Sequence, residues 1–191
     1  QVVHCDLPEK RAGVPWQRAL NSMLPADMTV VDVEAVDQGF HARLQAQAKA
    51  YTYTLCLRPE YVLPQRRPFV WWTGPLDQDK MMAGAGILTG KNDFCSFMNV
   101  GTPVRSTVRN LFAVSFSKGI IEEELVCTFW ADGFLKQMVR NLMAGLVAVG
   151  RGRLSRKGLQ EILESRDRGA APATAPASGL CLQEVRYKNW T

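Results

Sequence analysis

The sequence predicts an α+β fold: a mixed, largely antiparallel sheet with helices packed on one face. Two strand-like segments, 108–116 and 120–129, are separated only by residues 117–119, which favours a tight β-hairpin. Helical periodicity is confined to a few longer stretches, above all 134–149. A chain with hairpins and few β-α-β units is typical of an antiparallel sheet covered by helices.

In the first third of the chain we expect three strands and one short helix. Residues 1–7 and 29–36 are predicted strands, the second because its apolar side chains alternate. Between them, a helix should span Pro15–Leu24, with proline at its first position. The third strand is long, at 43–57, and a proline- and arginine-rich loop or hinge follows at 58–68. Alternate residues of this strand share one face: Lys49, Tyr51, Tyr53 and Leu55.

The rest of the chain is expected to mix helices and strands. Beside the hairpin, the predicted elements are a helix at 77–88, a helix at 134–149, a helix at 156–165, an irregular alanine- and proline-rich linker at 167–178, and a strand at 180–187. Gly90 and Gly150 should end the first two helices. Ser155 should cap the start of the third.

The composition is that of an ordinary globular protein. The 191 residues are 47% hydrophobic and 21% charged, and the net charge of +5 is compatible with an anionic partner without requiring one. The five cysteines form no C-x-x-C pair, which argues against a zinc site or a disulfide framework and favours a reducing, cytoplasmic compartment. No apolar run is long enough to predict a membrane helix, so no membrane association is expected.

An arginine within an apolar helix is the most informative single feature. Residues 134–149 are apolar on nearly every side, which is typical of a helix in a core. Arg140 interrupts the pattern, and Lys136 lies one turn before it on the same face. Since a guanidinium keeps its proton, a buried one needs an anionic partner. That partner is either a structural carboxylate or an anion that takes part in chemistry.

Motifs for phosphate loops, dinucleotides and metal ions are absent. Gly145 and Gly150 have the spacing of a phosphate loop, but Arg151 follows where that motif needs lysine and a hydroxyl residue. No Gly-x-Ser-x-Gly sequence is present.

Four local patterns remain, and each has a structural alternative. They are 40–43; 49–53; 92–97 followed by Arg105 and Arg109; and 134–141 with the distant 173–180. Two tyrosines on one strand face more often pack than catalyse, and Asp93 can cap a turn. His41 is more often a structural hydrogen-bonding residue than a base, because no acid near it in sequence would orient the ring. Arg105 and Arg109 are either solvated surface charge or phosphate contacts.

Taken in order, eight segments form a specific combination that no single one would provide. They are QVVHCDL (1–7), LNSMLP (20–25), FHAR (40–43), KAYTYTL (49–55), GKNDFCSF (90–97), VRSTVRN (104–110), FLKQMVRN (134–141) and ATAPASGLCLQEVRY (173–187). This combination resembles the TruA family of tRNA pseudouridine synthases over essentially all of the chain.

The resemblance implies a pseudouridine synthase-like fold and an enzyme that isomerises uridines of the tRNA anticodon stem-loop, positions 38–40, without cofactor or metal. Tyr51 would lie against the target uracil, and Arg140 would pair with the catalytic aspartate. The residues expected to hold the RNA are His41, Arg43, Arg58, Arg66, Arg67, Arg105 and Arg109. The family works as a homodimer in which one tRNA touches both subunits.

The chain departs from the family pattern in one respect. The family's nucleophilic aspartate lies in a Gly-Arg-Thr-Asp-Ala-Gly-Val-His stretch just before the Gln-Val-Val strand, and this sequence begins at Gln1. Asp6, Asp93 and Asp132 match no nucleophile position. We therefore expect a fragment that lacks the catalytic group and is inactive by itself.

The resemblance also suggests how the chain is organised. Residues 1–57 would be the remainder of an N-terminal half that includes the Tyr51 strand, and residues 58–191 would be the C-terminal catalytic-core half. Two other functions stay open: a non-catalytic RNA-binding module of the same fold, and a small-molecule enzyme of an unrelated α+β class.

Overall fold

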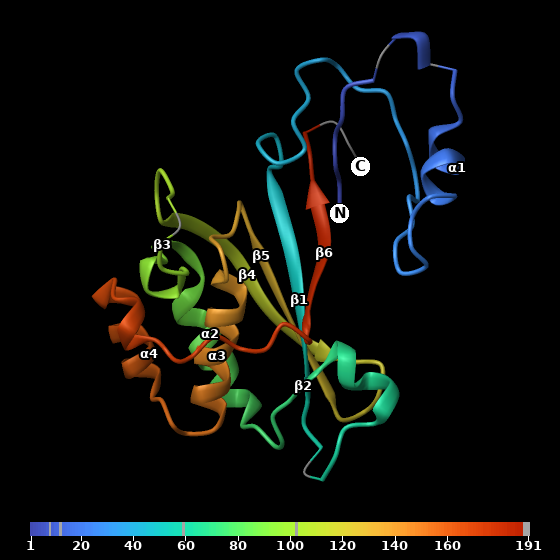
Figure 1. Ribbon diagram of the computed structural model, residues 1–191. Helices are drawn as coiled ribbons and strands as arrows, with labels where there is room; N and C mark the ends of the chain where they lie inside the picture. Colours follow the sequence, from blue (N-terminus) through green and yellow to red (C-terminus); the bar gives the residue numbers. More distant parts are fainter. Residues whose placement is uncertain (8, 12, 59, 102, 189–191) are drawn as a thin grey trace. The chain divides into compact units, whose positions relative to one another are not determined.

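A computed structural model of the chain describes residues 1–7, 9–11, 13–58, 60–101 and 103–188. It divides the chain into two compact units, Val2–Gln45 and Ala46–Thr191, the second of which also includes Gln1. Their elements are labelled in Figure 1. The boundary expected between residues 57 and 58 refers to the halves of the complete family fold, and it stays a prediction.

The described part of the unit Val2–Gln45 contains one α-helix, α1 (Trp16–Asn21), after a 3-10 helix at Glu9–Arg11. The predicted helix at Pro15–Leu24 is confirmed in its centre. It is shorter than expected, because Pro15 lies at the N-cap and the helix ends at Asn21.

The strands predicted at 1–7 and 29–36 were wrong. Neither segment has a ladder partner among the described residues, and a strand needs a neighbour for its backbone groups. In the segment 29–36, the side chain of Asn21 at the end of α1 binds backbone groups that a neighbouring strand would otherwise bind. Asn21 donates to the carbonyl of Val30 over 2.9 Å and accepts from its N–H over 2.7 Å.

The long strand predicted at 43–57 is confirmed as β1 (Ala48–Cys56). It starts later than expected, because the residues around His41 form a turn. The Gln45 N–H donates to the His41 carbonyl over 3.0 Å, and the N–H groups of Arg43 and Leu44 donate to His41 Nδ1 over 3.2 and 3.3 Å.

A six-stranded sheet forms the centre of the unit Ala46–Thr191. Its strands are β1, β2 (Trp71–Trp72), β3 (Gly90–Asp93), β4 (Val108–Lys118), β5 (Glu124–Ala131) and β6 (Leu180–Arg186). The order is β2-β1-β5-β4-β3, and β6 pairs with β1. Of the described pairs, only β1 with β2 is parallel. The predicted mixed, largely antiparallel sheet and its closing strand are confirmed.

The predicted β4–β5 hairpin is present, but its connection is longer than residues 117–119. β4 ends at Lys118 and β5 begins at Glu124, and the Glu124 carboxylate explains the difference. This buried group accepts from the Ile120 N–H over 3.1 Å and from the Arg66 guanidinium over 2.6 and 3.1 Å. The loop therefore folds around an ion pair instead of turning tightly.

The proline- and arginine-rich segment after β1 contains a 3-10 helix, Pro64–Phe69, which carries Arg66. A second ion pair joins Arg58 to Glu123 over 3.5 Å. These contacts fasten the segment to the β4–β5 hairpin, which argues against the hinge that its composition suggested.

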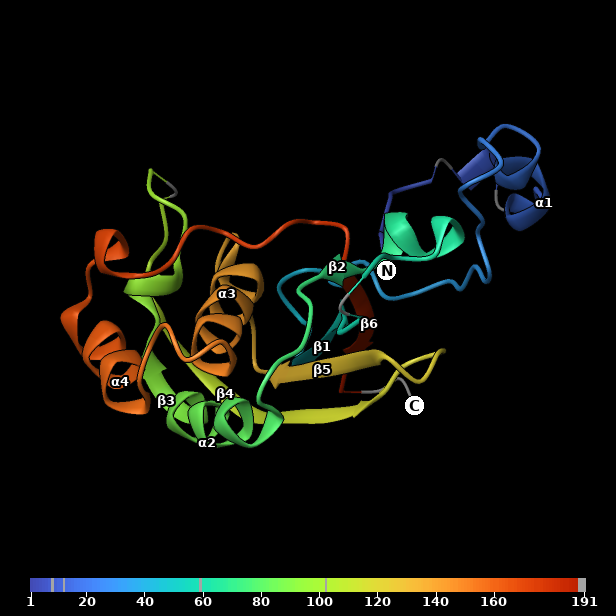
Figure 2. The same cartoon turned by 90° about the horizontal axis from the view of Figure 1, so that it is seen from below.

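Three helices pack against the sheet: α2 (Gln78–Leu88), α3 (Met138–Gly150) and α4 (Arg156–Ser165) (Figure 2). Ser155 caps α4 as predicted, since its side chain accepts from the Gly158 N–H over 2.9 Å. α3 begins at Met138 and not at residue 134, because Gln137 adopts a left-handed conformation with φ 65°. The turn before it leaves Phe134 and Lys136 outside the helix.

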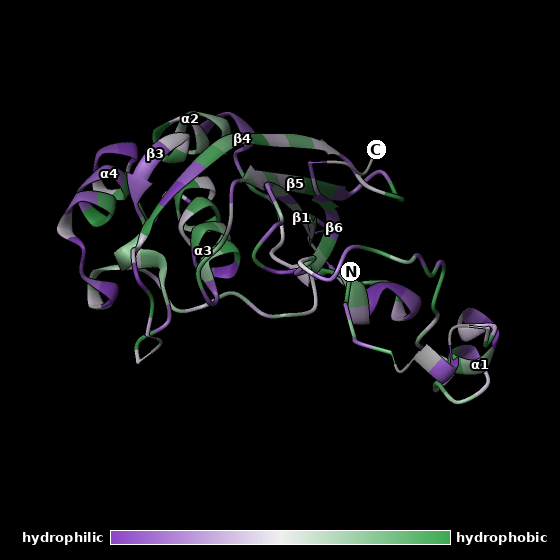
Figure 3. Cartoon of the chain, turned by 90° about the horizontal axis from the view of Figure 1, so that it is seen from above, coloured by the Kyte–Doolittle hydropathy of each residue, from purple (hydrophilic) through white to green (hydrophobic). Residues whose placement is uncertain are grey.

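The core lies on one face of the sheet. Its strand residues are Tyr53, Leu55, Leu111, Leu125, Cys127 and Phe129, and the register sets Tyr53 opposite Cys127. The helices contribute Met81, Leu88, Leu142, Met143, Leu146 and Leu159, and α3 is hydrophobic along most of its length (Figure 3). Gly145 of α3 allows close packing, because a Cβ there would meet Leu159 Cδ1 at 3.1 Å. The predicted one-sided helical layer is confirmed.

Candidate active site

Tyr51 lies on β1 close to the turn that leads into α3. The strand register sets it opposite Phe129, and its ring meets Phe134 edge-on, with centroids 5.1 Å apart at an angle of 87°. The side chain is half-buried, and burial raises the pKa of its phenol above the usual value. The site therefore contains an accessible aromatic ring with a neutral hydroxyl group.

Tyr53, two residues further along the same face, is fully buried. Its hydroxyl donates to the Pro176 carbonyl, and its ring contacts Trp71 at a centroid distance of 6.1 Å. Burial raises the pKa of the Tyr53 phenol, and the nearby charge of Arg140 opposes part of that rise. Tyr53 is thus a neutral donor that links β1 to a distant segment.

Arg140 lies in the first turns of α3, half-buried rather than enclosed in the core. Its Nε donates to the Ala175 carbonyl over 2.6 Å, and its Nη1 donates to Gln137 Oε1 over 2.7 Å. Among the described residues it forms no ion pair, and its Nη2 donates no hydrogen bond. The anionic partner expected from the sequence is therefore not among these residues, and neutral oxygens hold the guanidinium.

Residues 171–178, here called the strap, lead from the segment after α4 towards β6 (Figure 1). A 3-10 helix, Arg168–Ala170, precedes the strap, and the strap itself is irregular as predicted. Two consecutive strap carbonyls, of Ala175 and Pro176, accept from Arg140 and Tyr53. The strap thus brings the α3 arginine and the β1 tyrosine to one place.

Two further predicted site residues precede or begin β4. Arg109 Nη1 donates to the carbonyls of Ser106 and Val108 over 3.0 and 2.6 Å, and its side chain passes 3.6 Å from the position of a Cβ on Gly133. Gly133 directly precedes Phe134, so Arg109 lies beside the turn that carries Phe134. Arg105 is exposed, and neither arginine forms an ion pair within the described ranges.

His41 and Arg43 belong to the unit Val2–Gln45. His41 Nδ1 accepts from two backbone N–H groups of its turn, and its ring lies 4.5 Å from that of His4. This is the structural role considered for the histidine. Arg43 is exposed, and an RNA contact for either residue stays a prediction.

The segment 92–97 has a structural role. Asp93 Oδ1 accepts from the Cys95 N–H over 3.1 Å, which is the turn cap considered for it. Its other oxygen pairs with Arg166 over 3.2 Å, and the buried Ser96 hydroxyl donates to the Ile162 carbonyl over 2.6 Å. These contacts position the end of α4.

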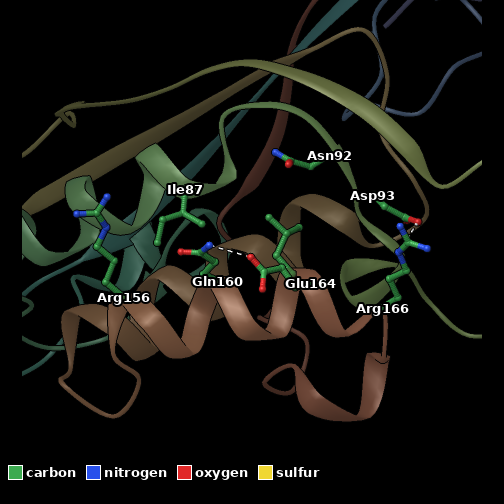
Figure 4. A pocket seen from close by; sticks show the side chains of 8 residues that line it. Ile87, Asn92, Asp93, Arg156, Gln160, Glu164 and Arg166 are labelled. Atoms are coloured by element: carbon green, nitrogen blue, oxygen red, sulfur yellow. Dashed lines mark hydrogen bonds and ion pairs between the residues drawn. The ribbon is translucent and has the colours of Figure 1, made fainter.

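A separate cavity of about 490 Å³ lies between α2, β3 and α4 (Figure 4). It is lined by Ile87, Asn92, Asp93, Arg156, Gln160, Leu163, Glu164 and Arg166. Polar groups in it bind one another: Asp93 pairs with Arg166, and Gln160 donates to Glu164 over 2.8 Å. The hydrogen bonds and ion pairs of these residues do not reach Tyr51 or Arg140 in the described structure, so we place the candidate active site elsewhere.

Sequence reasoning missed several members of the site. Gln137 and the Ala175 carbonyl accept from Arg140, and the Pro176 carbonyl accepts from Tyr53. A pattern of side chains does not predict which backbone oxygens act as acceptors. The sequence also did not predict the left-handed conformation of Gln137, because glutamine is a good helix former and lies within a helical pattern. Only the alanine- and proline-rich composition of 167–178 indicated that this segment would be irregular.

No group of three or more His, Cys, Asp or Glu residues in the described part of the chain could hold a metal ion. No described helix is both long and apolar enough to span a bilayer.

Comparisons with known proteins give one consistent result. A family model of tRNA pseudouridine synthases matches residues 85–188. Proteins named tRNA pseudouridine synthase A are 50% identical over 190 residues in Solidesulfovibrio magneticus and 46% identical over 187 residues in Maridesulfovibrio salexigens. Each alignment covers 98% of this chain and 69% of the relative. The protein of that name from Lawsonia intracellularis is 42% identical over 192 residues, with 98% of this chain and 75% of the relative covered.

Proposed function

The chain belongs to the TruA family of tRNA pseudouridine synthases, and on this premise we propose that it forms part of an active site that converts uridines of the anticodon stem-loop, positions 38–40, to pseudouridine. The observation that carries the proposal is the guanidinium of Arg140. It lies near Tyr53, which shares a strand face with Tyr51, and it forms no ion pair with a described residue. A guanidinium in that position is suited to bind a carboxylate that takes part in the reaction.

The proposed reaction moves a base without gaining or losing atoms. The C1′–N1 glycosidic bond breaks, the uracil turns, and a C1′–C5 bond forms. C5 loses a proton and N1 gains one, so the overall change needs no cofactor. Tyr51 and Phe134 form a half-buried aromatic surface on which an extruded uracil can be supported.

Arg140 would act by stabilising an ionised aspartate. An aspartate must be charged to serve as nucleophile or base, and an adjacent guanidinium lowers its pKa. Because Nε is held by a neutral carbonyl, Nη2 keeps its donors for a carboxylate. No described acid pairs with Arg140, which supports a carboxylate supplied from outside these 191 residues. The chain by itself would then be inactive.

Cations near the same turn would bind the RNA backbone. Arg105, Arg109 and Lys136 are the best candidates, since none of them forms an ion pair with a described residue. Arg66 and Arg58 are weaker candidates than the sequence suggested, because Glu124 and Glu123 already bind them. The remaining candidates are His41, Arg43 and Arg67.

Two further parts of the proposal follow from family membership alone. One is a homodimer in which a single tRNA touches both subunits. The other is a cytoplasmic location, where tRNA is modified.

The deciding experiment uses the protein encoded by the complete reading frame. Arg140→Ala should lower single-turnover pseudouridine formation by about a thousand-fold or more while tRNA affinity changes little, since an electrostatic partner of the reacting group is lost. The matched control is Arg156→Ala, which removes an exposed arginine that lines the separate cavity. Normal turnover in Arg140→Ala would remove that residue from the site. Salt-sensitive tRNA binding without any turnover in the parent protein would favour a non-catalytic RNA-binding module instead.

A further inference from the structure

Arg168, just before the strap, is bound entirely by neutral acceptors. Its Nη1 donates to the carbonyls of Ala171 and Pro172 over 3.1 and 3.0 Å. Its Nη2 donates to Asn141 Oδ1 and to Thr174 Oγ1, both over 3.1 Å. No described acid pairs with it. Four hydrogen bonds from one guanidinium therefore fix the path of the strap's first half.

Asn141 joins this network to the helix that carries Arg140. The side chain is fully buried, and its Nδ2 donates to the Phe97 carbonyl over 2.8 Å. Its Oδ1 accepts from Thr174 over 2.7 Å as well as from Arg168. Asn141 is thus fixed to the core and accepts hydrogen bonds from both Thr174 of the strap and Arg168.

The network ends beside the proposed catalytic group. Asn141 follows Arg140 on α3, and Thr174 precedes Ala175 on the strap. The two elements are therefore joined twice at neighbouring positions, once by Thr174 with Asn141 and once by Arg140 with the Ala175 carbonyl. Any displacement of the strap would move the acceptor that orients the Arg140 guanidinium.

We propose that Arg168 is a positioning residue: through Asn141 and Thr174 it fixes the Ala175 carbonyl, which holds Nε of Arg140 and directs the Nη2 side of the guanidinium toward the catalytic carboxylate. This rests on the proposed function, because it assigns a purpose to the orientation of Arg140. Arginine side chains lose considerable rotamer freedom when they are fixed, and the strap removes that freedom before substrate binds. The carbonyl is neutral, so it orients the guanidinium without cancelling its charge.

A purely structural role for Arg168 makes a different prediction. If the network only closes the strap over the core, its loss reduces the fraction of folded protein and nothing else. If it orients Arg140, its loss also weakens the contact with the carboxylate, and the pKa of that carboxylate rises. The acidic limb of the pH profile of kcat/KM reports this pKa, and a smaller amount of folded enzyme does not move it.

The test compares Arg168→Met with the parent protein of the complete reading frame. We expect kcat to fall by about ten- to a hundred-fold, as misplacement of a catalytic group does, while KM for tRNA changes less than about three-fold. The acidic limb should move to higher pH by about one unit. Arg168→Lys should restore part of both effects, because an ammonium can reach some of the same acceptors. Arg156→Met serves as the matched control and should leave the profile unchanged.

A second variant covers the case in which Arg168→Met does not fold. Thr174→Val keeps the shape of the side chain and removes the hydroxyl that links the strap to Asn141. It should shift the limb in the same direction by a smaller amount.

The outcomes separate the two proposals. An unshifted limb in both variants, with any loss of rate matched by loss of folded protein, would overturn the positioning role while leaving the proposed function intact. Absence of pseudouridine formation in the parent protein would overturn both.

Discussion

At the scale of single residues, the site depends on two tyrosines that the sequence makes look equivalent. Tyr51 and Tyr53 share a strand face, but only Tyr53 has a hydroxyl bound to the strap. Tyr51 donates no hydrogen bond to a described residue and packs on Phe134. Contacts with residues far away in the sequence decide which tyrosine is structural and which is available. The pattern Tyr-x-Tyr alone therefore does not distinguish the two.

Tyr51→Phe tests the hydroxyl separately from the ring. The variant keeps the aromatic surface, so tRNA affinity should stay within about three-fold. Single-turnover pseudouridine formation should fall by about a hundred-fold if the phenol transfers a proton. Burial raises the pKa of Tyr51, so the parent enzyme should show no alkaline limb from this residue below about pH 10. Unchanged turnover in the variant would restrict Tyr51 to supporting the base.

Tyr53→Phe tests the structural role of the second tyrosine. The free energy of unfolding of the 191-residue chain should fall by about 1–2 kcal/mol in urea titrations at neutral pH, because the Pro176 carbonyl loses its donor. A phenol whose pKa is raised by folding stabilises the fold below its unfolded pKa, and this is lost as pH rises.

The pH dependence of the same two proteins provides the check. Titration of Tyr53 should leave the free energy of unfolding of the parent protein unchanged below about pH 10 and lower it above that pH. In Tyr53→Phe, the free energy of unfolding should decline less steeply above about pH 10. Tyr51 and Cys127, whose pKa values burial also raises, account for part of the decline that remains. An equally steep decline in both proteins would contradict the assignment.

At the scale of elements, local signals predicted where α2 and α4 begin, whereas distant contacts set the extent of the strands and of the β4–β5 connection. Ser155 and Asp77 each cap their helix by accepting from the backbone N–H group three residues further on, so short-range chemistry decides these boundaries. The β4–β5 connection instead depends on Arg66, 58 positions from Glu124. The strands predicted at 1–7 and 29–36 failed for a similar reason, since a strand forms only with a ladder partner.

Glu124→Gln tests whether the buried ion pair defines the β4–β5 hairpin. Removing one partner leaves Arg66 without its counter-charge, and the free energy of unfolding should fall by about 3 kcal/mol. Glu123→Gln is the matched control, because the Glu123–Arg58 pair is partly exposed and is worth about 0–1 kcal/mol. Urea unfolding of the three proteins measures both differences. Equal effects of the two substitutions would show that the buried pair has no special role.

At the scale of the whole molecule, three of the motif segments contact one another, and the sequence alone does not predict the contacts that join them. The motif segments at 49–55 and 134–141 both bind the strap, most of which belongs to the third segment, 173–187. The family resemblance had placed Tyr51 and Arg140 at one site, whereas the sequence led us to expect a fully buried guanidinium. The residue is half-buried in the first turn of α3. That helix begins only at Met138, after the left-handed Gln137, and no side-chain pattern encodes this conformation.

The last prediction concerns the 191-residue chain by itself. If its cations bind the RNA backbone, it should bind an anticodon stem-loop with an affinity that falls steeply with salt. Arg105→Gln and Arg109→Gln should each weaken binding and reduce the slope of log K against log salt by about one, while Arg156→Gln should not. Filter binding across a salt series measures the slopes.

The same chain should form no pseudouridine in that RNA, because no described acid lies within ion-pair distance of Arg140. Binding without turnover in the 191-residue chain, and turnover in the protein of the complete reading frame, would show that the two functions reside in different parts of the protein. Turnover by the chain alone would instead mean that one of its own carboxylates reaches C1′ of the bound uridine, and Arg140 would then need a partner other than the one proposed.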